Sequence, residues 1–433
     1  MFLLNVSSNF YPEWAFSQNL LDSTHQRAIS KEKVFSFAPL LFAIPASRCE
    51  PGYREHTMAV YTILDRRTAA NVAESYDLGK LTKVTGLPAG SVNTLYLLET
   101  TRGKFFLKID EAKNMVDAQR ELGLLQFLRA RGLRCPQPLV DRHGQVLRLY
   151  HGKPLSLSLP LPGKALSETR LTPAHLTSVG QLLASLHLLS EHAPKSEENR
   201  FSFPRIVALY QEVRDYLPGY FKQIVHTLDD EITYQQEYQD DRLPKGLIHG
   251  DLFADNLLFR GEKLVGLLDF EAACYGKFLF DLATAINALC YSEGHFVVER
   301  FDALLAGYQS RRPLSLVEWD AFPNELRFSA LRFTVTRLKD FFLHPMDIRT
   351  RVNKDFREFF ERLQVLRRER SGGMARLLLA MAIGYDYRQH QKAPLQHGKP
   401  EGHKRTVGKR AGGRQRQSDL GQRKPRRSLQ TAR

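Results

Sequence analysis

The segment of residues 246–271 constrains the fold of this chain more than any other. It alternates short apolar runs with polar clusters, a pattern that predicts a strand, a charged loop, a second strand, a glycine turn and a third strand. Asp251 and Asn256 belong to the charged loop, and Asp269 follows the last apolar run. We therefore expect these three side chains to converge at one end of a small hairpin. The alternative is a purely structural turn, for which two acids and an amide at these offsets would be a poor choice.

Phosphoryl transfer from a nucleotide needs such a set of side chains. One carboxylate orients the acceptor hydroxyl and takes its proton, while an oxygen ligand and a second carboxylate hold Mg²⁺ on the phosphates. The pattern H-G-D-x-x-x-x-N at 249–256, followed by L-D-F-E at 268–271, resembles the catalytic loop and metal segment of small-molecule kinases of the aminoglycoside phosphotransferase and choline kinase superfamily. The resemblance implies ATP as phosphoryl donor, Asp251 as catalytic base, and Asn256 and Asp269 as Mg²⁺ ligands.

Two further residues belong to the same loop. His249 is either a reacting group or a brace of the loop, and the brace is favoured because the base and metal ligands are already supplied. Asp281 starts a helix predicted over residues 278–290. It is either a capping residue or, as the resemblance implies for its D-L-A segment, a residue that supports the catalytic loop.

The N-terminal half predicts a three-stranded antiparallel meander over residues 81–85, 95–99 and 105–109. In a kinase of this superfamily, the turn at 86–94 would lie over the nucleotide phosphates, where glycines and backbone N–H groups allow close approach. An ordinary hairpin turn is the equal alternative. The candidate phosphate-binding residues of this turn are Gly90, Ser91 and Asn93.

Lys108 lies in the middle of the third strand, where a lysine without a partner is costly. The helix predicted over 114–131 offers Glu121, and a Lys108–Glu121 pair would match the strand lysine and helix glutamate with which kinases hold the α- and β-phosphates. Asp117 and Glu111 are also within reach. The alternative is a lysine on the solvent face of an edge strand.

Helices are predicted through the second half of the chain. A helix that starts at Thr172 carries His187, which we expect to be packed or solvated rather than functional. A longer helical region follows at 204–239. The capping box Ser315–Glu318 starts another helix, ahead of one predicted over 324–342.

These elements predict an α+β, two-lobed, protein kinase-like fold. Residues 58–160 form a small antiparallel-sheet lobe that binds nucleotide, and residues 161–370 form a larger, mainly helical lobe for catalysis and substrate. Because the pattern changes at Met58, we expect residues 1–57 to be a disordered or non-native extension. Residues 371–433 form a basic, low-complexity tail.

The formal net charge of +15 resembles that of a nucleic-acid binder, but its distribution argues against one. From Tyr387 onward there are 14 Lys and Arg against 2 acidic residues, so the tail carries +12 and the rest only +3. We expect a solvated tail with at most weak contact to RNA. The rival interpretation, a non-catalytic protein that binds nucleic acid through this tail, predicts no affinity for nucleotides.

The spacing of the cysteines and the length of the apolar runs indicate the cellular compartment of the protein. The four cysteines are scattered without a C-x-x-C pair, which argues against a zinc site or a disulfide framework and favours the cytoplasm. The apolar run within residues 31–49 is too short to span a bilayer, so no membrane association is expected.

Several shorter segments between Met58 and Arg368 are typical of one subfamily. They are residues 58–62, 91–94, 101–103, 131–138, 152–154, 279–283 and 330–333. Together they resemble bacterial homoserine kinases of the aminoglycoside-phosphotransferase-like type. The resemblance implies transfer of the γ-phosphoryl group of ATP to the hydroxyl of L-homoserine, a step of threonine biosynthesis. Choline, ethanolamine, a sugar or an aminoglycoside is the alternative acceptor.

The charged groups of the acceptor limit which residues can line its binding pocket. Homoserine carries a carboxylate and an ammonium, which call for a guanidinium and an acidic or carbonyl partner. Arg332 and Arg337 lie among apolar positions of the last predicted helix, where they either extend to solvent or face the substrate cleft. With Glu271, which stands where an aromatic residue is more usual in the subfamily, they are the candidate substrate residues. An aminoglycoside would call for an acidic cleft, whereas the charge of this lobe is mixed.

Overall fold

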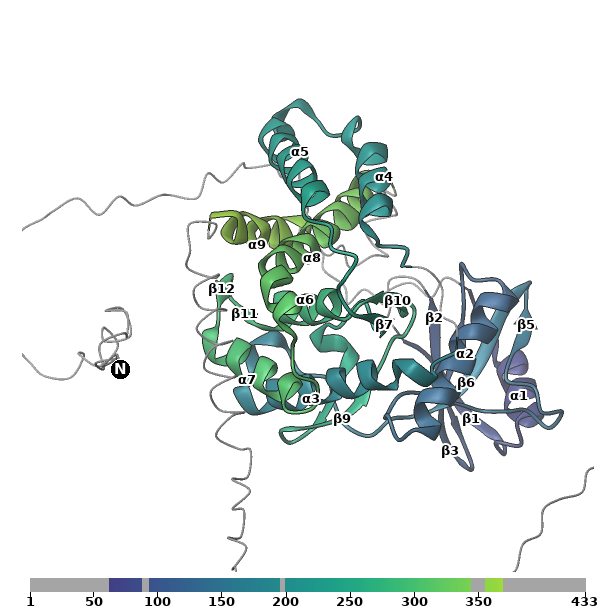
Figure 1. Cartoon of the computed structure of the whole chain (residues 1–433). Helices are drawn as coiled ribbons and strands as arrows, with labels where there is room; N and C mark the ends of the chain where they lie inside the picture. The colour runs from purple at the N-terminus through teal and green to yellow at the C-terminus, as the bar shows by residue number, and fades with distance from the viewer. Residues whose placement is uncertain (1–61, 88–92, 195–198, 344–354, 369–433) are drawn as a thin grey trace, which may run out of the picture. The chain divides into compact units, whose positions relative to one another are not determined.

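The computed structural model describes residues 62–87, 93–194, 199–343 and 355–368, drawn in colour in Figure 1. The predicted extension that ends before Met58, the basic tail, and Gly90 and Ser91 of the phosphate turn lie outside the described residues. Within the described ranges, no helix is both long enough and apolar enough to cross a bilayer.

An antiparallel sheet forms the first part of the fold, in the order β1-β2-β3-β6-β4, with β5 paired to β6. Its strands are β1 (Leu81–Leu87), β2 (Thr94–Thr100), β3 (Gly103–Ile109), β4 (Gln137–Pro138), β5 (Arg148–Tyr150) and β6 (Lys153–Leu159). The predicted three-stranded meander is confirmed as β1 to β3. Helices α1 (Arg66–Ser75) and α2 (Met115–Ala130) pack against this sheet (Figure 1).

The alternation of side chains along β3 separates an apolar face of the sheet from a charged one. Leu107 and Ile109 are fully buried in a core that includes Val72 of α1. Lys108 lies between them and therefore points to the opposite face, where it meets Glu121 of α2. The strand thus buries its apolar residues on one side and directs its lysine to the other.

The second part of the fold is mainly helical, as predicted. Its helices are α3 (Pro173–Leu188), α4 (Phe203–Arg214), α5 (Lys222–Glu237), α6 (Phe278–Leu289), α7 (Val298–Gln309), α8 (Leu316–Phe342) and α9 (Phe356–Arg368). Short two-stranded sheets pair β7 (Lys245–Ile248) with β10 (Cys274–Lys277), β8 (Leu257–Arg260) with β9 (Lys263–Leu267), and β11 (Tyr291–Ser292) with β12 (His295–Phe296). This arrangement is the predicted α+β, kinase-like fold. The boundary at residue 160 remains a prediction.

One helix prediction was wrong. The capping box Ser315–Glu318 is present, but it starts α8 itself, which continues to Phe342 without a second start near residue 324. Pro323 lies inside α8 and removes one backbone donor from the helix. Its neighbours Phe322 and Leu326 are buried, and this packing holds the helix together across the proline.

Helices α3 and α7 pack with almost no space between their backbones. A Cβ atom added at Gly180 of α3 would lie 2.0 Å from a backbone oxygen of α7, and one added at Gly307 of α7 would lie 2.2 Å from a backbone oxygen of α3. Glycine is therefore required at both positions. Because the two helices approach so closely, His187 of α3 and Tyr308 of α7 come within hydrogen-bonding distance.

Candidate active site

The residues of the H-G-D motif lie in the loop between β7 and β8, which ends in the 3-10 turn Ala254–Asn256. Nδ2 of Asn256 donates to the backbone oxygen of Asp251 (2.9 Å), and the backbone oxygen of Asn256 accepts from the backbone N–H of Leu268 (2.8 Å). The loop is thereby tied to the residue that precedes Asp269. Among the described residues, none donates a hydrogen bond to Oδ1 of Asn256, so this oxygen is available to a ligand.

Asp269 lies beside this loop in a left-handed backbone conformation (φ 57°), which is uncommon for a residue other than glycine. Asp269 is exposed to solvent, but the protein atoms close to its carboxylate, the charge of Glu271 and the charge of Asp251 raise its pKa to about 6. A divalent cation would relieve this repulsion between carboxylates, and carboxylate and amide oxygens are ligands that Mg²⁺ prefers. Asn256 and Asp269 therefore fit a Mg²⁺ ion.

His249 is fully buried, and both of its ring nitrogens are used within the motif. Nε2 donates to the backbone oxygen of Leu268 (2.9 Å), and Nδ1 accepts the backbone N–H of Asp251 (3.3 Å). The ring packs edge-on against Phe270. These contacts match the bracing role and leave neither nitrogen for proton transfer.

Asp281 holds the same loop from the first turn of α6. Its carboxylate accepts the backbone N–H groups of His249 (2.7 Å) and Gly250 (2.8 Å). Gly250 has a φ of 77°, and a Cβ atom there would lie 2.8 Å from the backbone oxygen of Ala272, so only glycine fits between the two segments. Of the two interpretations of Asp281, support of the loop agrees with these contacts.

Sequence reasoning missed the residue that supports Asp281. His187 donates from Nε2 to Asp281 (3.1 Å), Nδ1 is hydrogen-bonded to the Tyr308 hydroxyl (2.7 Å), and the ring stacks on Phe278. Burial by itself raises the pKa of Asp281, but the hydrogen bonds that it accepts from His187 and from the backbone N–H of His249 contribute to lowering that pKa below its ordinary value. Nothing local in the sequence distinguishes His187 from a packed histidine, because its partner lies 94 residues away.

Lys108 is the centre of a group of charged side chains that we call the lysine cluster: Lys108, Lys113, Asp110, Glu121 and Glu271. Lys108 forms ion pairs with Asp110 (3.0 Å), Glu121 (3.1 Å) and Glu271 (2.8 Å). Burial alone disfavours its charge, but Glu121, Glu271 and Asp110 outweigh burial and raise the pKa of the ammonium. The structure therefore contains the predicted Lys108–Glu121 pair.

The other acids considered as partners of Lys108 are engaged elsewhere. Glu111 pairs with Lys153 and accepts the hydroxyl of Thr94 (2.6 Å). Asp117 pairs with Arg120 (3.2 Å) at the start of α2. Glu121 is thus the helix partner of Lys108, and the lysine does not lie on a solvent face.

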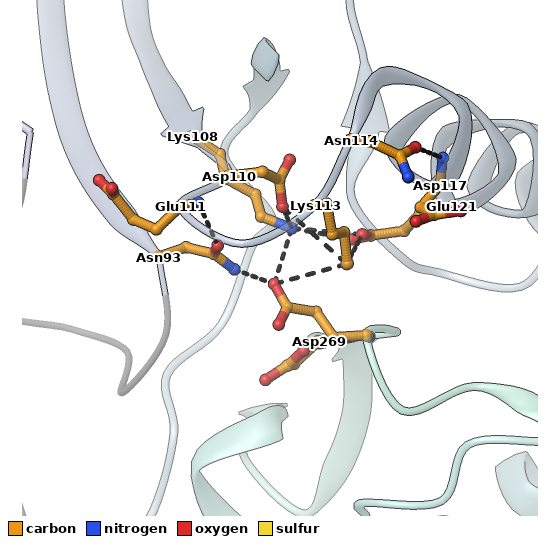
Figure 2. A network of polar contacts seen from close by, with 10 residues as sticks. Asn93, Lys108, Asp110, Glu111, Lys113, Asn114, Asp117, Glu121 and Asp269 are labelled. Carbon is orange, nitrogen blue, oxygen red and sulfur yellow. Dashed lines mark hydrogen bonds and ion pairs between the residues drawn. The ribbon is translucent and has the colours of Figure 1, made fainter. Parts of the chain in front are cut away.

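Of the three candidate phosphate-binding residues, Asn93 lies within the described ranges, and it joins the lysine cluster through Glu271. Its Nδ2 donates to the Glu271 carboxylate, and its Oδ1 accepts the backbone N–H of Glu111 (3.2 Å). Figure 2 shows Asn93 on one side of Lys108 and Glu121 on the other. Glu271 follows Asp269 by two residues, so these contacts connect the sheet to the segment of the candidate metal ligands.

Arg332 of α8 lies beside the predicted base. Its Nη1 is 3.5 Å from Oδ1 of Asp251, and its guanidinium stacks on the rings of Phe201 (3.8 Å) and Phe333 (3.6 Å). The side chain is buried, which lowers the pKa of the guanidinium to about 10. Within the described part of the chain, its buried Nε has no hydrogen-bond partner. Arg332 therefore does not extend to solvent.

Arg337 and Glu271 point elsewhere. Nη1 of Arg337 donates to Glu358 (2.6 Å) and to the backbone oxygen of Asp355 (2.8 Å). Among the described contacts, no ion pair joins Glu271 to Arg332 or Arg337. The structure therefore separates the three candidate substrate residues, and it brings Arg332 alone against Asp251.

A pocket of about 590 Å³ opens beside the catalytic loop. Phe253 and Asp255 of the loop line it, together with Glu168, Arg337 and Glu358. Burial and the nearby charge of Glu358 raise the pKa of Glu168, and no described residue forms an ion pair with Glu168. The pocket thus presents a guanidinium and an excess of carboxylates.

Comparison with known proteins agrees with the geometry. Residues 83–314 match the phosphotransferase enzyme family. The chain is 36% identical over 313 residues to a homoserine kinase of Xanthobacter autotrophicus, covering 71% of this chain and 95% of that protein. It is 37% identical over 314 residues to a homoserine kinase of a Caulobacter species, covering 72% and 97%.

A solved structure shares the fold. An amicoumacin kinase in complex with AMP-PNP and Ca²⁺ aligns with a TM-score of 0.53 at 17% identity, over 71% of this chain and 93% of that one. An enzyme of the same fold therefore binds an adenine nucleotide together with a divalent cation. The chain belongs to the phosphotransferase enzyme family.

Proposed function

We propose that this protein is an ATP- and Mg²⁺-dependent kinase that phosphorylates the hydroxyl group of L-homoserine in the cytoplasm. The observation that carries this proposal is the ion pair between Lys108 and Glu271, which brings the lysine of the sheet to the hairpin that holds Asp251, Asn256 and Asp269. Relatives that bear the name homoserine kinase support the acceptor.

In this proposal the acceptor oxygen attacks the γ-phosphorus of ATP, the bond to the β–γ bridging oxygen breaks, and ADP leaves. Asp251 orients the hydroxyl and takes its proton. Mg²⁺, when bound through Oδ1 of Asn256 and the carboxylate of Asp269, would neutralise charge on the phosphates. Lys108, steadied by Glu121, holds the α- and β-phosphates.

We assign the acceptor's carboxylate to Arg332. This guanidinium is next to the base, and its planar set of N–H donors matches the two oxygens of a carboxylate. Two rings hold the guanidinium plane, so little side-chain freedom is lost on binding. A carboxylate here would leave the hydroxyl end of a short amino acid close to Asp251.

The acceptor's ammonium is assigned to the pocket beside the loop. Glu168, which lines this pocket, has no ion-pair partner among the described residues. An ammonium would relieve the repulsion between Glu168 and Glu358. Arg337, which lines the same pocket, keeps Glu358 in place.

The test is a panel of acceptors. ADP formation is measured with Mg-ATP and L-homoserine, choline, ethanolamine, a hexose or an aminoglycoside. We expect turnover that depends on L-homoserine. Turnover with another alcohol and none with L-homoserine would contradict the acceptor and leave the kinase assignment intact. No turnover with any acceptor, together with no binding of ATP, would contradict the kinase assignment.

A further inference from the structure

The lysine cluster contains a second ammonium group, that of Lys113, which has no role in the proposed phosphoryl transfer. Lys113 lies in the connection between β3 and α2. It forms an ion pair with Glu121 and lies 3.9 Å from Asp110 and 3.8 Å from Glu271. These are the same three carboxylates that Lys108 contacts, so both ammonium groups share one set of acids.

Glu271 differs from the other two acids of the cluster. Asp110 directly follows β3 and Glu121 lies on α2, whereas Glu271 comes from the segment that follows β9. One oxygen of its carboxylate, Oε1, lies 2.8 Å from Nζ of Lys108 and also accepts the Asn93 amide. Two ammonium groups and an amide N–H around one oxygen form the kind of donor set that binds a phosphate oxygen.

The charges of the cluster show why a second lysine is needed. Without Glu271, Lys108 alone would face Asp110 and Glu121, which leaves an excess negative charge that repels a phosphate. Lys113 cancels that excess. Figure 2 shows Lys113 and Lys108 with their side chains directed to the same region, between Asp110 and Glu121.

We propose that Lys113 is a second phosphate-binding residue, and that in the nucleotide-free protein the Glu271 carboxylate occupies the place that a nucleotide phosphate takes between Lys108, Lys113 and Asn93. The proposal rests on the proposed function. A phosphate and the carboxylate carry like charges and use the same donors, so binding of one displaces the other. Lys108 and Lys113 then remain balanced by Asp110 and Glu121.

The test measures the Kd for ATP by calorimetry. EDTA is present to remove divalent cations, so that a contact of Glu271 with a metal ion cannot affect the measured Kd. Lys113→Met should weaken binding about fivefold or more, and Lys113→Arg should retain most of the affinity. Glu271→Gln should tighten binding about fivefold, because the competing charge is removed while the shape is kept. Lys83→Met, at a mostly exposed lysine of β1, is the matched control and should bind as the wild type does.

Two results would overturn the inference. One is a Lys113→Met variant that binds metal-free ATP within twofold of the wild type. The other is a Glu271→Gln variant with equal or weaker affinity. Neither depends on the acceptor, so a failure of the homoserine assignment leaves this test unaffected. A wild-type protein that binds no ATP would contradict both this inference and the proposed function.

Discussion

The guanidinium of Arg332 lies 3.5 Å from the carboxylate of Asp251, although Arg332 is on α8 and Asp251 is in the loop after β7. The contact joins a buried, stacked arginine to the residue that we propose as base. The proposed base therefore lies beside a group that can bind an anion, and this proximity is one reason why we propose an acceptor alcohol that carries a carboxylate.

Replacement of Arg332 should affect the acceptor more than the nucleotide. Arg332→Lys keeps the charge but loses the planar, two-pronged donor set, so we expect the KM for L-homoserine to rise about tenfold or more while the KM for ATP stays within about twofold. Steady-state kinetics with each substrate varied in turn measures both values. Arg357→Lys, at a half-exposed arginine, is the control. An unchanged KM for homoserine would show that Arg332 does not bind the acceptor.

Replacement of Asp281 should disturb the catalytic loop and the stability of the fold together. The carboxylate accepts two backbone N–H groups and the ring of His187, whereas the amide in Asp281→Asn has a single oxygen. At least one buried donor would lose its partner, at a cost of about 1–3 kcal/mol in the free energy of unfolding. Urea denaturation measures that loss, and kcat should fall because the loop backbone is no longer fixed. Wild-type stability and kcat in the variant would refute a supporting role.

The stability of the protein should decrease as the pH falls below about 6.5 because of His187. Burial is the main cause that lowers its pKa from the ordinary 6.5; Asp281 and Glu318 act to raise it, and Arg312 acts to lower it further. The unfolded chain therefore binds a proton at this residue at a higher pH than the folded chain does. The contribution of His187 is present above about pH 6.5 and is lost as the pH falls toward the lower pKa of the folded state.

Thermal melts between pH 8 and pH 5 test this dependence. The melting temperature of the wild type should fall more steeply below pH 6.5 than that of His187→Gln, which cannot take up the proton. The matched control is His226→Gln, at an exposed histidine of α5, and it should follow the wild type. Parallel curves for the wild type and His187→Gln would contradict the prediction.

The sequence was sufficient for the parts of the site that are local in the chain. Asn256 and Asp269 lie together because they flank the paired strands β8 and β9, which are only a few residues long. Asp251 lies in the loop just before them, where the Asn256 amide donates to its backbone oxygen. The Lys108–Glu121 pair follows from a strand and the helix directly after it, 13 residues apart.

Contacts between distant segments could not be predicted, because no local pattern specifies which elements pack together. The pairing of Glu271 with Lys108, instead of with an arginine, depends on how the segment after β9 meets the sheet. The position of Arg332 at Asp251 depends on the packing of α8, and burial there outweighs the tendency of arginine to reach solvent. The sequence favours extension of Arg332 to solvent and a position in the substrate cleft equally. Only the packing of α8 distinguishes these two alternatives.

The turnover of Asp251→Asn with saturating L-homoserine and Mg-ATP tests most directly whether Asp251 is the base of a homoserine kinase. The amide keeps the shape of the side chain but cannot accept the hydroxyl proton. We predict that kcat falls by about 10²–10⁴-fold while the Kd for ATP is unchanged. Homoserine-dependent turnover of this variant at the wild-type rate would contradict the account.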